Sequence, residues 1–203
     1  MASNRACVFP LLLFLAVSPA VAQSADFDAC VKQSGENAIA ACSDAIASGA
    51  FTGDRLAELY NSRGAEWRLR NNYERAIADY DEALLLAPHY VAALNNRCWA
   101  LAAVGRAKAG LDDCNVSLQV RPGNGGTHNN RALANFKLGN FDEAFADTEI
   151  ALKGNPRRST ALYLRGLIKA RRGDAAGADA DIAAAKRIRA AIESEFHRIG
   201  VER

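Results

Sequence analysis

Residues 61–88 read NSRGAEWRLRNNYERAIADYDEALLLAP, and the same pattern returns at 95–122, 129–156 and 163–190. Successive copies therefore begin 34 residues apart (95 − 61 = 34). Two charged positions recur in every copy: the arginines Arg63, Arg97, Arg131 and Arg165, and the aspartates Asp79, Asp113, Asp147 and Asp181. A fixed period of this length is typical of a stacked array, in which each unit buries its apolar face only against its neighbours.

Each copy is predicted to form two helices joined by a short turn. In the first copy, apolar residues fall at helical spacing between Tyr60 and Trp67 and again between Ala76 and Leu84. The gap between them holds Asn71. The other copies have a glycine there, which suits a left-handed helix end: Gly105, Gly139 and Gly173. Prolines, which end a helix at the preceding residue, close three copies: Pro88, Pro122 and Pro156.

The 34-residue period and its small and aromatic positions resemble the tetratricopeptide repeat from about residue 57 to the C-terminus. The residues that carry the resemblance are Gly64, Trp67, Ala76, Tyr80, Ala83, Ala132, Phe141, Ala144 and the closing prolines. It implies an all-α fold, a right-handed superhelical solenoid of tandem helix-turn-helix units, with the first helices lining a concave face that binds peptides. Gly110 and Cys114 depart from the pattern in the second unit, and we expect this departure to weaken the packing there.

The chain is predicted to have six parts. These are a signal peptide (1–22), an N-terminal cap hairpin (23–56), three repeat units (57–90, 91–124 and 125–158) and a fourth unit with a C-terminal capping helix (159–203). Ala190 stands where a fourth proline is expected, so the last helix is predicted to continue from about Asp174 to about Ile199. Its apolar stripe either covers the last unit or contacts a partner.

The N-terminal segment has the features of a leader. Arg5 precedes the apolar run 8–17, and Ala20, Val21 and Ala22 form an A-x-A cleavage site before Gln23. The run is too short to cross a bilayer, which takes about 20 residues. The mature chain is therefore expected to be periplasmic or secreted and to contain no membrane span.

Four cysteines remain after cleavage, and an even number in an exported chain suggests two disulfides. In a helical hairpin, residues equidistant from the turn lie side by side. This geometry selects Cys30–Cys42, centred beside Gly35, and Cys98–Cys114, centred beside Gly105, from the three possible connectivities. The alternative is four buried free thiols that act as small apolar residues.

The recurring arginines and aspartates can form a ladder. Arg63 and Asp79 are equidistant from the turn within the first unit, and Asp79 and Arg97 are equidistant from the turn between units. A continuous ladder would fix the register of the array if it is partly buried. The alternative is solvated surface charge, which contributes little to stability.

Asparagines recur in the first helix of successive units. Asn61, Asn95 and Asn129 form one column, and Asn96 and Asn130 form the next. An asparagine offers both a donor and an acceptor, so such a column can hold an extended peptide backbone without reading its side chains. The alternative is helix-start chemistry, in which asparagine is common.

Two aromatic residues complete the predicted peptide-binding groove. Trp99 lies one helical turn after Asn95 on the same face, and Tyr163 is the fourth-unit equivalent of the asparagine column. Trp99 either anchors a peptide or packs in the core between units.

The residue patterns favour a binding protein over an enzyme. The formal net charge of +2, without a basic stripe, does not favour nucleic acid. No zinc-protease, phosphate-loop or S-x-x-K motif occurs, and we expect no metal and no cofactor. The prediction is an exported, non-catalytic and monomeric scaffold for a protein or peptide partner. The alternative is a disulfide-stapled helical-repeat hydrolase, similar to the disulfide-rich repeat proteins reported as β-lactamase-like.

Overall fold

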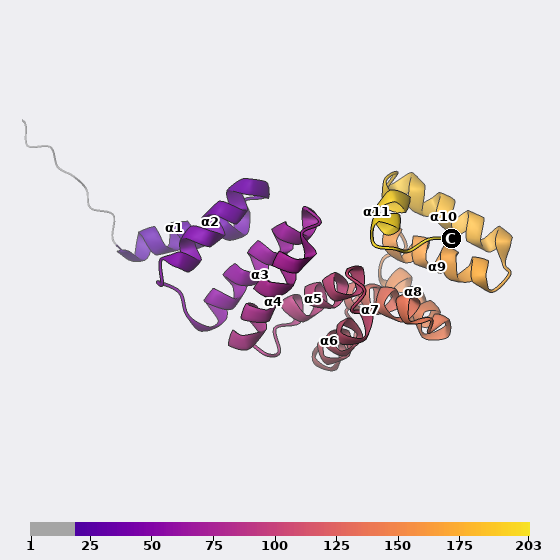
Figure 1. Ribbon diagram of the computed structural model, residues 1–203, viewed down its shortest axis with the longest axis horizontal. Helices are drawn as coiled ribbons and strands as arrows, with labels where there is room; N and C mark the ends of the chain where they lie inside the picture. The colour runs from indigo at the N-terminus through magenta and orange to yellow at the C-terminus, as the bar shows by residue number, and fades with distance from the viewer. Residues whose placement is uncertain (1–18) are drawn as a thin grey trace, which may run out of the picture.

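The computed structural model describes residues 19–203, and this part of the chain contains eleven helices and no strand (Figure 1). Most of the predicted leader lies outside the described residues. The helices are α1 (Pro19–Lys32), α2 (Gly35–Ala47), α3 (Gly53–Leu69), α4 (Tyr73–Leu86), α5 (Val91–Ala103), α6 (Ala107–Val120), α7 (Gly125–Leu138), α8 (Phe141–Gly154), α9 (Ser159–Arg171), α10 (Ala175–Ile188) and α11 (Ile192–Arg198).

Consecutive helices pack in pairs, and the pairs stack in chain order. The first ten helices form five hairpins, from α1 with α2 to α9 with α10. The first helices α3, α5, α7 and α9 also contact one another and form the inner layer of a curved array. The predicted all-α, right-handed superhelical solenoid is confirmed.

Small residues stand where the two helices of a unit come closest. A Cβ atom added at Gly64 would lie 2.7 Å from the Tyr80 ring, and one added at Gly166 would lie 2.7 Å from Ile182. The turns between helices adopt the left-handed conformation that the sequence predicts, with φ of 60° at Asn71 and 84° at Gly105. Close approach within each hairpin therefore depends on side chains that are absent or small.

The structure contains both predicted disulfides. Cys30–Cys42 joins α1 to α2 with a Cα–Cα distance of 4.5 Å, and Cys98–Cys114 joins α5 to α6 at 5.5 Å. The expectation that Gly110 and Cys114 weaken the packing of the second unit is wrong. A Cβ atom at Gly110 would lie 2.6 Å from the Cys98 carbonyl oxygen, so the missing side chain is what lets the disulfide-linked helices meet.

The arginine and aspartate columns pair within each unit. Four bonds cross from the first helix to the second at 2.7 to 2.8 Å: Arg63–Asp79, Arg97–Asp113, Arg131–Asp147 and Arg165–Asp181. All four aspartates are buried. In each pair the arginine fork contacts both carboxylate oxygens. The pairs are therefore part of the core and not solvated charge.

The predicted continuation of the ladder from Asp79 to Arg97 is wrong. The outer nitrogen of Arg97 instead binds Asp81, two residues further along α4, at 2.7 Å. The later units show the same contact: Arg131 donates to Asn115, and Arg165 donates to Glu149. Both oxygens of each buried aspartate already bind the arginine of their own unit. The next arginine therefore uses the residue two positions on.

The predicted single helix from Asp174 to Ile199 is also wrong. The chain leaves the helix at Arg189, which has an extended backbone, and turns back into α11. The turn buries an apolar cluster of Ile192, Phe196, Ile199 and Val201 against the last unit. This burial replaces the helical hydrogen bonds that a straight continuation would have made.

Candidate functional site

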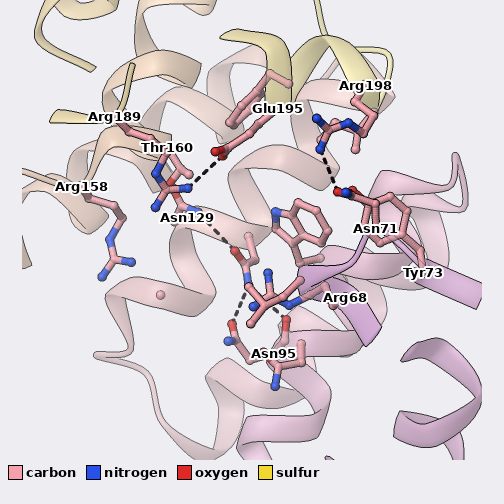
Figure 2. A pocket seen from close by; sticks show the side chains of 17 residues that line it. Arg68, Asn71, Tyr73, Asn95, Asn129, Arg158, Thr160, Arg189, Glu195 and Arg198 are labelled. Atoms are coloured by element: carbon pink, nitrogen blue, oxygen red, sulfur yellow. Dashed lines mark hydrogen bonds and ion pairs between the residues drawn. The ribbon is translucent and has the colours of Figure 1, made fainter. Parts of the chain in front are cut away.

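A polar cavity of about 420 Å³ lies between the inner helices and the C-terminal segment (Figure 2). Helices α5 and α7 supply four of its asparagines, Asn71 comes from the turn between α3 and α4, and α3 and α9 supply further polar side chains. Helix α11 covers one side, where Arg198 donates to Asn71 Oδ1 at 2.9 Å across 127 residues of sequence. The superhelix therefore brings the first and last repeat units to the same pocket.

The pocket collects most of the predicted site residues. Its lining includes the predicted residues Asn95, Asn96, Trp99, Asn129 and Asn130.

Two of the predicted residues lie outside the lining. Asn61 sits behind Asn96 and accepts a hydrogen bond from its Nδ2 at 3.1 Å. The placement of Tyr163 on an open groove is wrong, because Tyr163 is only 2% exposed and its ring packs against Phe196 of α11 with a centroid distance of 4.9 Å. The C-terminal turn that ends α10 is the reason, since it lays α11 over this part of the inner layer.

The asparagine columns form a network that links neighbouring units. Asn130 Nδ2 donates to Asn95 Oδ1 at 3.0 Å, and Asn129 Nδ2 donates to Asn130 Oδ1 at 3.2 Å. Thr160 of α9 donates to Asn129 Oδ1 at 2.8 Å. The orientation of each amide follows from these partners. Much of the asparagine recurrence therefore serves the contact between units.

Two asparagine side chains in the pocket each have one amide atom without a hydrogen-bond partner among the described residues. Asn95 uses its side-chain oxygen as an acceptor, and Asn96 uses its nitrogen as a donor. The Asn95 Nδ2 and Asn96 Oδ1 atoms have no hydrogen-bond partner among the described residues. Both side chains are partly exposed. A free donor and a free acceptor on adjacent residues match the two hydrogen-bonding groups of a peptide unit.

Trp99 serves both the core and the pocket. It packs against two clusters of buried residues, and it also lines the cavity. The Tyr73 ring meets it edge-on at a centroid distance of 5.4 Å, and the Arg68 guanidinium lies 5.3 Å over it. Burial raises the pKa of Tyr73, so its hydroxyl stays protonated and donates to Asn71 Oδ1 at 2.9 Å. Contacts on several sides hold the indole ring at the pocket wall.

The charged residues that line the pocket are four arginines and one glutamate. Arg189 pairs with Glu195 at 2.9 Å, and Arg198 binds Asn71. Arg68 and Arg158 form no ion pair within residues 19–203. The Nε atom of each is buried and has no hydrogen-bond partner. The pocket is therefore electropositive: of its four arginines only Arg189 has a carboxylate partner among the described residues, and Arg198 is bound to a neutral amide.

Other site types find little support in the described part of the chain. Residues 19–203 contain no group of three or more His, Cys, Asp or Glu side chains that could hold a metal ion. No described helix is long and apolar enough to span a membrane.

Comparison with known proteins places the fold. Neither a family model nor a curated protein matches the chain. Among solved structures, the MamA RS-1 ArsTM double mutant superposes with a TM-score of 0.64 at 16% identity, covering 86% of this chain and 97% of that one. YrrB, described as a TPR protein with an unusual peptide-binding site, has a TM-score of 0.56 at 17% identity, covering 82% and 84%.

A third solved structure was obtained with a peptide. The first TPR of Spaghetti (RPAP3), bound to the HSP90 peptide SRMEEVD, has a TM-score of 0.56 at 21% identity, covering 62% of this chain and 99% of that one. Together these similarities show that the chain has the tetratricopeptide repeat fold.

The sequence reading missed the arginines of the pocket. Arg68 and Arg158 recur in no other unit, and Arg189 and Arg198 belong to a turn and a helix that were not predicted. One signal was available for Arg158. It precedes the first helix of unit four, where the preceding unit has the helix-capping residue Asn124.

Proposed function

We propose that this protein is an exported, non-catalytic scaffold that binds an extended peptide segment of a partner protein in its concave pocket. The observation that carries the proposal is the pair of unused amide groups, Asn95 Nδ2 and Asn96 Oδ1, beside the half-buried Trp99. The amides can bond one peptide unit of the ligand, and the indole offers apolar area for a neighbouring side chain.

The fold neighbours support this role. One of them is described with a bound HSP90 peptide and another with a peptide-binding site. For this chain, the concave position of the pocket and its polar lining support the same kind of ligand.

Export is supported by the cysteines. Both disulfides lie within helical hairpins, and disulfides persist in oxidising compartments such as the periplasm. In the proposal, residues 1–22 are a removed leader and residues 23–56 form the capping hairpin. N-terminal sequencing of the mature protein should begin at Gln23, whereas retention of Met1 in the exported protein would contradict the leader.

Affinity capture from an envelope extract tests the binding role. Asn95→Ala removes the free donor and should lose captured partner, whereas Asn37→Ala, an exposed asparagine of α2, should retain it. Circular dichroism should show that both variants stay folded. Capture by Asn95→Ala at the wild-type level would contradict the role of the amide pair.

Trp99 can report binding directly. The chain has two tryptophans, so Trp67→Phe leaves Trp99 as the only indole emitter. Its emission should shift when the captured partner is added back. An unchanged spectrum with bound partner would place the ligand elsewhere. A nitrocefin assay on the same protein should show no hydrolysis, which separates the scaffold from the β-lactamase-like alternative.

A further inference from the structure

The charge of the protein is divided between its two halves. Residues 23–96 contain 11 acidic and 6 basic residues, whereas residues 97–203 contain 12 acidic and 18 basic residues. No Asp or Glu occurs in residues 114–141 or 150–173. The small net charge of the whole chain conceals this division, and a one-sided half indicates a partner of opposite charge. Even full pairing with the carboxylates of the second half would leave cations over.

The free cations of the second half gather where the second helix of each unit ends. Helices α6, α8 and α10 end at equivalent positions of the repeat, which are Val120, Gly154 and Ile188. Two basic residues at the end of α10, Lys186 and Arg189, are paired with carboxylates of α11. Four others lie within three residues of these helix ends, are exposed, and have no side-chain partner among the described residues: Arg121, Lys153, Arg157 and Arg187.

Stacking brings these helix ends together along one edge of the array, because equivalent positions of neighbouring units lie side by side in a solenoid. A Cβ atom added at Gly125, at the start of α7, would lie 3.7 Å from Ala151 near the end of α8 and 3.9 Å from the Arg158 guanidinium. The turn after α6 therefore lies next to the turn after α8. We name the four free cations the basic edge. It is not visible as a run of charge in the sequence, since its residues come from different units: Arg121, Lys153, Arg157 and Arg187.

Exposed apolar side chains lie among these cations. Val120 is 50% exposed and Ile188 is 39% exposed, at the same position of the repeat. Unit three has Gly154 at that position. Its exposed apolar residue, Ile150, stands one helical turn earlier and lines a hollow of about 530 Å³ together with Lys153. Cations around exposed apolar side chains are the composition of a surface that binds an anionic bilayer interface.

Helix-end electrostatics alone do not account for the basic edge. A cation near a helix C-terminus is stabilising, yet α4 and α6 have no basic residue in the last turn. At the end of α4 the same repeat position holds Leu86, beside a hollow lined by Asp54 and Glu58. The edge is therefore acidic at unit one and basic at units two to four, although the helices end at equivalent positions.

We propose that the basic edge docks the protein on the surface of a bilayer that contains acidic phospholipids. The four cations contact lipid phosphates, and Val120 and Ile188 enter the interface between headgroups and acyl chains. These apolar side chains distinguish the partner from a nucleic acid, whose backbone offers them no apolar region to enter. None of the four cations lines the polar pocket, so docking and peptide binding use different residues.

Co-sedimentation with vesicles tests the proposal on the mature protein, purified after export and without the apolar leader. Vesicles of phosphatidylcholine alone should leave the protein in the supernatant, and an equimolar mixture with phosphatidylglycerol should sediment it. The bound fraction should fall as salt is raised, because counter-ions screen the attraction. Soluble glycerol phosphate at the same phosphate concentration should compete poorly, since it cannot bind several cations at once.

A matched pair of charge variants connects binding to the basic edge. Lys153→Gln combined with Arg157→Gln should weaken binding about 25-fold, since each cation near an acidic bilayer contributes a factor of about five. Arg106→Gln combined with Lys108→Gln removes the same charge from exposed residues at the turn between α5 and α6. That control should bind almost as wild type, because the screening length is about 8 Å at physiological salt. Circular dichroism should show that both variants stay folded.

A second matched pair tests the apolar contact. Ile188→Ser should weaken binding to the mixed vesicles, because it removes an apolar side chain that enters the interface. Leu86 occupies the equivalent position at the acidic end of the edge and is exposed to a similar extent, 37% against 39%. Leu86→Ser should therefore leave vesicle binding unchanged.

Several results would overturn the proposal. Equal binding to both kinds of vesicle would do so, as would equal loss in the two charge variants, which would show that only net charge matters. Full competition by glycerol phosphate would show a site for small phosphates instead of a docking surface. Equally tight binding of wild type and Ile188→Ser to a single-stranded DNA oligonucleotide would assign the edge to polyanions in general. None of these results bears on capture of a peptide partner, so the proposed function is tested separately.

Discussion

Replacing Gly110 with alanine should destabilise the protein, although alanine favours helices. Gly110 lies inside α6, facing the Cys98 carbonyl oxygen of α5. The new Cβ atom would stand 2.6 Å from that oxygen, closer than such contacts occur in real proteins. The obstacle is backbone, so no side-chain rotation can relieve it. Helices α5 and α6 would have to separate, and the Cys98–Cys114 disulfide opposes this movement.

The expected size follows from two opposing terms. Gly→Ala in a helix interior stabilises by about 0.8–1.0 kcal/mol. Inserting a carbon into a closely packed contact costs about 1–3 kcal/mol. Because the blocking atom cannot rotate away, we expect the upper half of that cost and a net loss of about 1–2 kcal/mol. For a chain of this size, each kcal/mol lowers the melting temperature by about 2–4 °C.

Thermal unfolding followed by circular dichroism measures the effect, with Gly154→Ala as the matched control. Gly154 ends α8, and a Cβ atom added there meets nothing within 4 Å. That substitution should stabilise the protein slightly. The penalty at Gly110 should shrink when Cys98 and Cys114 are both changed to serine, because the helices can then move apart. A Gly110→Ala variant as stable as Gly154→Ala would refute the close-contact argument.

The remaining predictions concern the disulfide and the buried charges. Changing Cys98 and Cys114 to serine should cost about 3 kcal/mol, from a Cys separation of 16 positions, in denaturant unfolding under oxidising conditions. Asp147→Asn breaks a buried contact with an arginine and a histidine and should cost about 2–4 kcal/mol, whereas Asp81→Asn, at an exposed pair, should cost less than about 1 kcal/mol. Burial alone would raise the pKa of Asp181, but its Arg and Lys partners hold that pKa below the ordinary value. Its stabilisation is therefore present above about pH 4 and lost as pH falls through the folded pKa, so the stability difference between wild type and Asp181→Asn should shrink in acid titrations.

The hairpins and disulfides could be predicted because they depend on local spacing. A 34-residue repeat fixes where each helix turns, and residues equidistant from a turn must meet. Cys98–Cys114 and Arg63–Asp79 both have a separation of 16 positions and both form as expected. The contacts between units were harder to predict from the sequence, because two acidic residues, Asp79 and Asp81, were both candidate partners for Arg97. Arg97 binds Asp81 because Asp79 is already bound to Arg63.

The position of α11, which covers one side of the pocket, could not be predicted from the sequence. Helix α11 follows the last repeat, so it has no counterpart from which its position could be inferred. Its contact between Arg198 and Asn71 joins residues 127 positions apart, and the curvature of the whole array determines whether they meet. The same turn buries Tyr163, which the repeat pattern alone places on an open surface.

The asparagine columns show how recurrence and function separate in this fold. Asn130 is the equivalent of Asn96 in the next unit. The side-chain nitrogen of each donates a hydrogen bond to an asparagine of the preceding unit, which is a structural role. Residues that serve the contact between units must recur, because every unit has the same neighbours. A binding group faces a ligand that does not repeat with the array, so it has no reason to recur. Arg158 fits this second description, since no other unit has an arginine at the equivalent position, where unit two has Tyr90 and unit three has Asn124. Like Tyr90, Arg158 makes no side-chain cap bond, whereas a capping residue such as Asn124 contributes about 1 kcal/mol of helix stability. The departures from the repeat, more than the repeat itself, are therefore the positions to test for binding in the pocket.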